Sequence, residues 1–173
     1  AYDTATVIVH HGVISGGVLV DDRAVVTLTS TSMERVDTND NGTLNVGDTA
    51  IKGLLTANGN SRINLDSVNA ETYVYAYGSS TITIRGSSQF ASDLSALDTS
   101  NIIMTSGDVD GALNGLVDAT IQMTGGSAHS GIAASSSTLI VSGGTIFENL
   151  TANLQGTVNL LGGSVGGDLL VND

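Results

Sequence analysis

The side chains of this sequence that are best suited to chemistry are the aspartates and asparagines of its first third. Residues 37–48, DTNDNGTLNVGD, place Asp37, Asn39 and Asn41 at the first, third and fifth positions, a glycine at the sixth and Asp48 at the twelfth. This spacing is typical of EF-hand calcium loops, whose oxygen ligands surround the ion. Residues 42–47 also fit a β-strand, and a strand cannot form half of a loop between two helices. We therefore do not expect a complete EF-hand.

A looser calcium site is the stronger hypothesis. Asp and Asn recur at one corner of three successive repeats, described below, where they could face a single ion. The candidate ligands are Asp21, Asp22, Asn39, Asp40, Asn41, Asn58 and Asn60. Residues 37–48 also resemble dockerin-type calcium loops, with Asn45 at the ninth position. Because Asp and Asn favour tight turns for conformational reasons alone, calcium is a possible ligand, and no cofactor is required.

Other reactive groups are sparse. The histidines His10, His11 and His129 are too widely separated in the repeat to share a metal ion, and we expect them to be solvated. The chain has no cysteine, no Gly-x-Ser-x-Gly elbow and no phosphate-binding loop. All the basic residues lie within residues 1–85, so the second half has no cation to stabilise a developing anion. We predict a protein without enzymatic activity; a carbohydrate-active β-helix enzyme is the weaker alternative.

The charge of the chain excludes several classes of partner. The formal net charge is −12 at pH 7, so nucleic acid and anionic membranes are poor partners. No apolar run approaches the roughly 20 residues that span a bilayer, and membrane insertion is not expected.

Three tyrosines suggest a contact surface. Tyr73, Tyr75 and Tyr77 alternate with Val74 and Ala76, so all three should face outward from one strand. An exposed aromatic stripe suits glycan stacking or lateral packing against another protein. A chance cluster that covers the strand edge is the alternative.

These residues must be positioned by a repeat that runs through the whole chain. Similar units of 18, 19 or 20 residues begin at residues 6, 25, 43, 62, 81, 101, 120, 138 and 157. Apolar residues recur at offsets 1, 3, 8, 12 and 14 from each start, which is strand alternation interrupted by Gly, Ser and Asx turn residues. One unit cannot bury its own apolar face, but stacked units can.

The predicted fold is all-β, a single parallel β-helix or β-solenoid domain of about nine turns over residues 1–173, right-handed as crossover connections usually are. Outward positions support this register. Asp66 and Arg85 would be neighbours on adjacent turns, and Glu34, Lys52 and Glu71 would alternate in sign. Where the template weakens, we expect Val36 to fill the core of the second turn, Phe90 to follow an inserted residue in the fifth, and Ile132 and Ala134 to face inward in the seventh.

The first and last units look interchangeable. Residues 6–22 and 157–173 place small aliphatic residues at the same offsets and Gly or Asx in the same gaps. Neither unit carries a helix, a proline or a charged plug, although natural solenoids usually cap both ends. Stacking the last turn of one copy on the first turn of the next would make a filament. The predicted end-to-end interface consists of Val7, Val9, Ile14, Val18, Val158, Leu160, Val165 and Leu169.

Three units of the second half carry a family resemblance. TIQMTGG at 120–126, TLIVSGG at 138–144 and TVNLLGG at 157–163 are each followed by a second short apolar strand. They resemble the passengers of self-associating autotransporter adhesins, which carry imperfect repeats of this length. The resemblance implies an extracellular place on the bacterial cell surface and a role in adhesion, aggregation or a biofilm matrix.

Two functional hypotheses remain open. The first is a non-enzymatic extracellular subunit of a self-assembling filament, whose main partner is another copy of itself. The alternative is a fragment of a longer adhesin passenger, in which neighbouring turns of the same polypeptide cover both ends. Other surface proteins or glycans are possible partners in either case.

Overall fold

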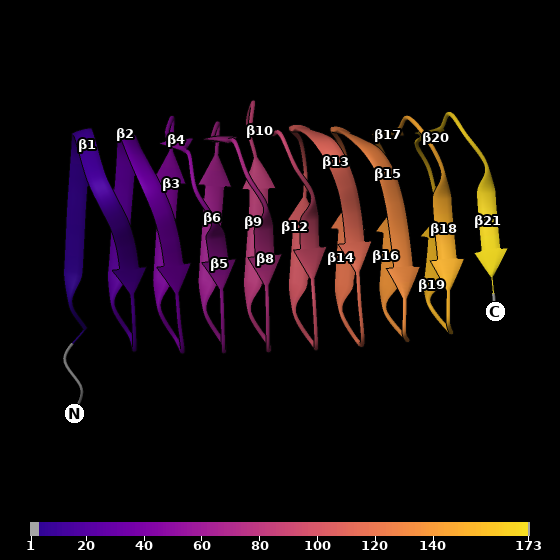
Figure 1. Ribbon diagram of the computed structural model, residues 1–173, viewed down its shortest axis with the longest axis horizontal. Coiled ribbons are helices and arrows are strands. Elements are labelled where there is room, and N and C mark those ends of the chain that lie inside the picture. Colours follow the sequence, from indigo (N-terminus) through magenta and orange to yellow (C-terminus); the bar gives the residue numbers. More distant parts are fainter. Residues whose placement is uncertain (1–3, 173) are drawn as a thin grey trace.

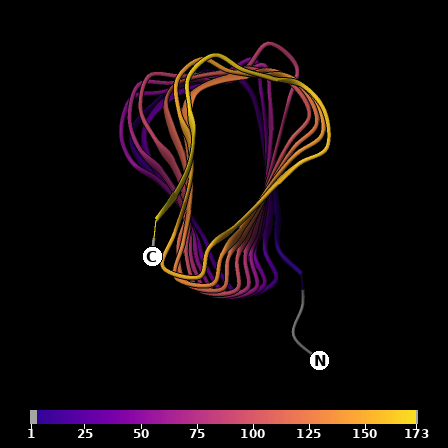
Figure 2. The ribbon, with the colours of Figure 1, turned by 90° about the vertical axis from the view of Figure 1, so that its right-hand side faces the viewer.

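The chain forms a parallel β-solenoid. The structure, a computed structural model, describes residues 4–172 and contains strands joined by turns and short loops, with no helix in this range. Figure 1 shows the turns stacked side by side from the N-terminus to the C-terminus, and Figure 2 shows them superimposed along the axis. The strands are β1 (Thr6–Val20), β2 (Val25–Thr38), β3 (Thr43–Gly47), β4 (Ala50–Ile51), β5 (Leu55–Ala57), β6 (Arg62–Asp66), β7 (Asn69–Ala70), β8 (Val74–Ala76), β9 (Thr81–Arg85), β10 (Gln89–Phe90), β11 (Leu94–Ala96), β12 (Asn101–Met104), β13 (Asp108–Gly115), β14 (Thr120–Met123), β15 (Ser127–Ala134), β16 (Thr138–Val141), β17 (Thr145–Ile146), β18 (Leu150–Asn153), β19 (Thr157–Leu160), β20 (Ser164–Val165) and β21 (Leu169–Asn172).

The strand register follows the sequence repeat. Thr6 pairs with Val25, Val25 with Thr43, and the ladder continues through Arg62, Thr81, Asn101, Thr120, Thr138 and Thr157, always between parallel strands. These are the first residues of the nine units. The predicted class, an all-β parallel solenoid of about nine turns, is therefore confirmed.

The core is a set of aliphatic columns. Leu28, Val46, Leu65, Ile84 and Met104 stack in one column with at most 3% of each side chain exposed. Because stacked strands lie about 4.8 Å apart, each layer holds one modest side chain per column, which explains the scarcity of aromatic residues. Phe90 is the largest fully buried side chain. Val36 fills the second turn as predicted, between Val18 and Leu55.

The seventh turn departs from the prediction. Gly131 and Ala133 are buried and pair with Leu113 and Gly115, whereas Ile132 is only half-buried. The turn from Thr120 to Thr138 is one residue shorter than the average, and the deletion falls before Gly131. The glycine fits because a Cβ there would lie 2.7 Å from the Cδ atoms of Leu139 and Leu150, which fill its space.

The predicted charge ladders are partly present. The Nε of Arg85 lies 3.2 Å from a carboxylate oxygen of Asp66 on the adjacent turn, as expected. Glu34, Lys52 and Glu71 are exposed and form no ion pair within residues 4–172. Exposed side chains of this kind gain little by fixing one geometry, so an alternation in sign along a column does not by itself produce ion pairs.

A column of buried serines lines one corner inside the solenoid. The Ser137 hydroxyl donates to the carbonyl of Gly115 (2.7 Å) and accepts from the N–H of Ala134 (2.8 Å). Ser100 repeats the arrangement with the carbonyl of Ala76 and the N–H of Leu97. These hydroxyls tie the end of one turn to the turn below it. Ser61 lies in the same column, but its hydroxyl has no hydrogen-bond partner within residues 4–172.

Candidate functional site

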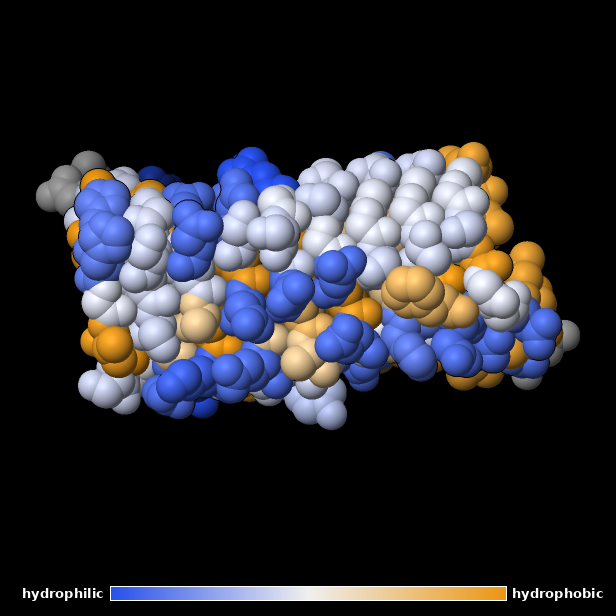
Figure 3. Space-filling model, turned by 90° about the horizontal axis from the view of Figure 1, so that it is seen from above, coloured by the Kyte–Doolittle hydropathy of each residue, from blue (hydrophilic) through white to orange (hydrophobic). Residues whose placement is uncertain are grey.

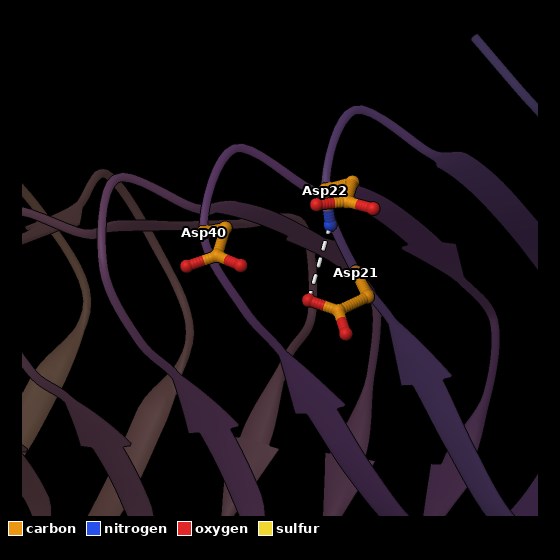
Figure 4. Close-up of side chains that lie close together, drawn as sticks. All are labelled: Asp21, Asp22 and Asp40. Atoms are coloured by element: carbon orange, nitrogen blue, oxygen red, sulfur yellow. Dashed lines mark hydrogen bonds between the residues drawn. The ribbon is translucent and has the colours of Figure 1, made fainter. Parts of the chain in front are cut away.

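The residues predicted to hold a cation lie at one corner of the first three turns. Carboxylate oxygens of Asp21, Asp22 and Asp40 all come within 4.8 Å of one another, and all three residues are exposed (Figure 4). Two of them occupy the left-handed backbone region, with φ of 54° at Asp22 and 50° at Asp40. Asp tolerates this conformation better than most residues, so the turns themselves account for part of the pattern.

The asparagines of the same corner are used differently. The amide of Asn58 donates to the side-chain oxygen of Asn39 at 2.9 Å, which forms a ladder between turns. Asn41 and Asn60 are exposed, and their backbone N–H groups donate to the carbonyls of Asp22 and Asp40. The structure thus gathers three carboxylates of the seven predicted ligands. Hard oxygen ligands suit calcium, and calcium binding stays a prediction.

The complete EF-hand is excluded within this segment, as expected. β2 extends to Thr38 and β3 covers Thr43–Gly47, so no helix flanks residues 37–48. Asp48 follows the C-terminal end of β3, whereas Asp40 of the acidic corner precedes its N-terminal end.

The three tyrosines form a stacked row. The ring centroids of Tyr73 and Tyr75 are 6.1 Å apart, and those of Tyr75 and Tyr77 are 5.7 Å apart. Tyr73 is the most exposed, while Tyr75 and Tyr77 are half-buried. Burial, together with Tyr75 and the charge of Asp98, raises the pKa of the Tyr77 phenol above its ordinary value. The row faces outward as predicted; its partner stays a prediction.

The histidines lie on the surface. His10 is within hydrogen-bond distance of the Thr29 hydroxyl, at 2.7 Å, and His11 and His129 are exposed. His129, in the seventh turn, lies too far from the two histidines of the first turn to share a metal ion with them.

Both end faces of the described solenoid expose apolar side chains. Val7, Leu160 and Leu169 occupy core columns, yet are 50%, 43% and 58% exposed because nothing in residues 4–172 covers them. The other predicted interface residues, Val9, Ile14, Val18, Val158 and Val165, are partly buried against the core. Of the thirteen exposed large apolar residues in the described range, nine belong to the first or the last turn. The edges thus concentrate most of the exposed apolar surface.

Two outward leucines were missed by the sequence analysis. Leu19 and Leu170 are 65% and 36% exposed and lie in one outer column, at opposite ends of the solenoid. The pairing runs from Leu19 through Asp37, Thr56, Tyr75, Ser95, Asn114, Ile132 and Thr151 to Leu170. Comparing the outward offsets of the first and last units would have found them, because both leucines sit 13 residues after the start of their unit.

No protein-family model, curated protein or solved structure matches this chain. The fold and its exposed surfaces therefore define the class of protein, a parallel β-solenoid built of repeats of about 19 residues. Within residues 4–172 no helix is both long and apolar enough to cross a membrane.

Proposed function

We propose that this chain is a non-enzymatic structural subunit that builds a filament by stacking end to end with copies of itself. The observation that carries the proposal is the pair of outward leucines. Leu19 and Leu170 share a column that is mostly polar in the turns between them, so leucine in this column occurs only on the two terminal turns. If the last turn of one copy lies on the first turn of the next, the two leucines become neighbours and cover each other.

The backbone favours the same arrangement. In a parallel ladder each strand uses alternate residues to bond with each of its two neighbours. Each terminal strand of the described solenoid bonds to a neighbour on one side only. Half of its peptide groups therefore point along the solenoid axis, away from the other turns, without a strand partner. Such edges invite pairing with another strand. Pairing β19, β20 and β21 of one copy with β1 of the next would continue every ladder by one step.

The core columns would also continue without an offset. Val158, Leu160, Val165 and Leu169 would lie on Val7, Val9, Ile14 and Val18 of the next copy, at the same offsets within their units. Fully burying a Val or Leu side chain contributes about 1.5–3 kcal/mol, so covering these side chains supplies a large favourable term. Because the two faces of this contact differ, it does not close on itself and it generates a fibre.

The extracellular setting rests on the resemblance to self-associating adhesin passengers. Under this proposal the filament belongs to a bacterial surface or a biofilm matrix. The alternative is that further turns of the same polypeptide cover both edges, as in a long adhesin passenger. In that arrangement the exposed edges would pair with the neighbouring turns of the same polypeptide. The length of the encoding gene distinguishes a filament of separate copies from one long passenger.

Electron microscopy of the purified chain tests the proposal. We expect filaments whose thickness equals one solenoid, and we expect Leu170→Asp to shorten or abolish them by placing a charge in the joint. Leu154→Asp is the matched control, because Leu154 is 61% exposed but lies on the side of the eighth turn. Monodisperse short rods from the unaltered chain in all buffers, or equal loss of filaments in both variants, would overturn the proposal.

A further inference from the structure

A second surface lies on the side of the solenoid, away from both ends. Figure 3 shows the face that carries the short strands β4, β7, β10, β17 and β20, where apolar surface is visible between hydrophilic side chains. A cleft of about 410 Å³ opens there across the fourth to eighth turns. It is lined by Asn69, Gln89, Phe90, Ala91, Asp108, Asp110, Ser127 and Phe147.

The register places one short side chain at the middle of this cleft. Phe90 pairs with Ala70 on one side and with Val109 on the other, so Ala91 stands between Glu71 and Asp110. The single methyl group of Ala91 replaces the longer acidic side chains of its neighbours. This short side chain leaves room at the middle of the cleft, beside Phe90 and Asp110.

Phe147 gives the cleft an exposed aromatic wall. Its side chain is 60% exposed, in a chain that contains only two phenylalanines and no tryptophan. The other phenylalanine, Phe90, is buried and contributes to the floor of the cleft. An exposed phenyl ring at the rim of a concave site is a surface on which a ligand with an apolar face can lie.

The polar groups of the cleft combine donors and acceptors. Asn69, Gln89 and Asp108 stand in register on three adjacent turns, so two amides and a carboxylate form one row. Ser127 donates to one carboxylate oxygen of Asp108 at 2.6 Å, which fixes that side chain and leaves its second oxygen as an acceptor. Asp110 adds another carboxylate. Amides can both donate and accept, whereas carboxylates accept only.

We infer that this cleft binds a neutral saccharide. A sugar ring has an apolar C–H face that fits the Phe147 ring, and hydroxyl groups that can donate to the carboxylates and exchange hydrogen bonds with the amides. No Lys or Arg lines the cleft, and the chain carries a net charge of −12, so uronates and sulfated sugars are repelled. The site lies on the side of the rod, and it does not depend on end-to-end stacking.

Binding is tested by calorimetry and by amide chemical-shift mapping with neutral tetrasaccharides of glucose, mannose, galactose and xylose. A glucosamine trimer serves as the cationic probe and a galacturonate trimer as the acidic probe. We expect at least one neutral tetrasaccharide to bind, with shifts centred on Ala91, Asp110 and Phe147. Phe147→Ala should weaken its affinity by about tenfold or more. Asp110→Asn should weaken it less, because an amide keeps an acceptor.

Leu154→Ala is the matched control, since Leu154 is 61% exposed against 60% for Phe147 and lies outside the cleft. Circular dichroism shows whether each variant keeps its fold. The inference is overturned if no neutral probe binds, if Leu154→Ala and Phe147→Ala lose affinity equally, or if the glucosamine trimer binds tighter than every neutral probe. Binding without filaments would leave this inference intact and refute only the stacking proposal.

Discussion

Leu19 and Leu170 lie in the same outer column of the solenoid, on its first and last turns, and both point away from the core. The turn that carries an outward leucine does not itself shield that side chain from water. The leucine gains when a second apolar side chain lies beside it in the column. In the proposed joint between copies, the register that brings Leu170 beside Leu19 on the outside is the same register that continues the apolar columns inside.

The buried serine column predicts unequal effects of the same substitution. Ser137→Ala removes a buried hydroxyl that donates to the carbonyl of Gly115 and accepts from the N–H of Ala134, so two hydrogen bonds are lost. We expect it to lower the free energy of unfolding by about 1–3 kcal/mol. Ser61→Ala removes a buried hydroxyl that has no partner in the described part of the chain and should be neutral or slightly stabilising. Denaturant unfolding of both variants measures the difference, and equal losses would contradict the role assigned to the column.

The tyrosine row predicts a loss of stability in alkaline solution. The pKa of Tyr77 is raised above 10.0 by burial, by Tyr75 and by Asp98, so the unfolded chain releases this proton at lower pH than the folded chain. The stabilisation is complete below pH 10.0 and is lost as the pH rises through the folded value. Comparing tyrosinate absorbance of the unaltered chain and of Tyr77→Phe isolates this group.

Asp98→Asn tests the cause of that shift. The amide keeps an acceptor for the N–H of Gly78, to which Asp98 is bonded at 3.1 Å, but it removes the negative charge. The pKa of Tyr77 should fall toward its ordinary value while part of the shift remains, because burial is the larger cause. A Tyr77 that titrates at or below the ordinary value in the unaltered chain would refute this reading.

Calcium binding at the acidic corner can be separated from binding at residues 37–48. If the corner binds the ion, calcium raises the melting temperature of the unaltered chain, because a ligand that binds only the folded state stabilises it. Asp22→Asn should blunt this rise, since Asp22 belongs to the corner alone. Asp48→Asn should not, since Asp48 belongs to the loop-like segment alone. No thermal effect of calcium, or an effect removed only by Asp48→Asn, would reject the corner site.

The repeat could be predicted from the sequence because each interior column position is apolar in nearly every turn. Nine imperfect repeats are enough to define the common pattern. The template failed at Ile132, where a one-residue deletion could be placed on either side of a short strand. The pairing of Gly131 with Leu113, and the space that Leu139 and Leu150 fill, show that Gly131 faces inward. Local spacing could not decide between the two placements.

The candidate sites were harder to predict than the fold. The acidic corner was found because Asp and Asn recur in successive units, although which of them meet depends on backbone conformation at Asp22 and Asp40. Leu19 and Leu170 were missed because the interior offsets define the repeat, whereas offset 13 faces outward and varies from turn to turn. The Phe147 cleft was missed because it depends on the relative size of side chains on adjacent turns, and no single unit reveals that.

Cross-linking tests the end-to-end joint most directly. The chain has no cysteine, so a variant with both Leu19→Cys and Leu170→Cys reports only on these two positions. Neighbouring parallel strands place paired Cα atoms within the range that a disulfide spans. The stacking proposal predicts that mild oxidation gives a ladder of covalent oligomers on a non-reducing gel, and that Leu19→Cys with Leu154→Cys does not. Monomers alone, or equal ladders from both variants, would contradict it.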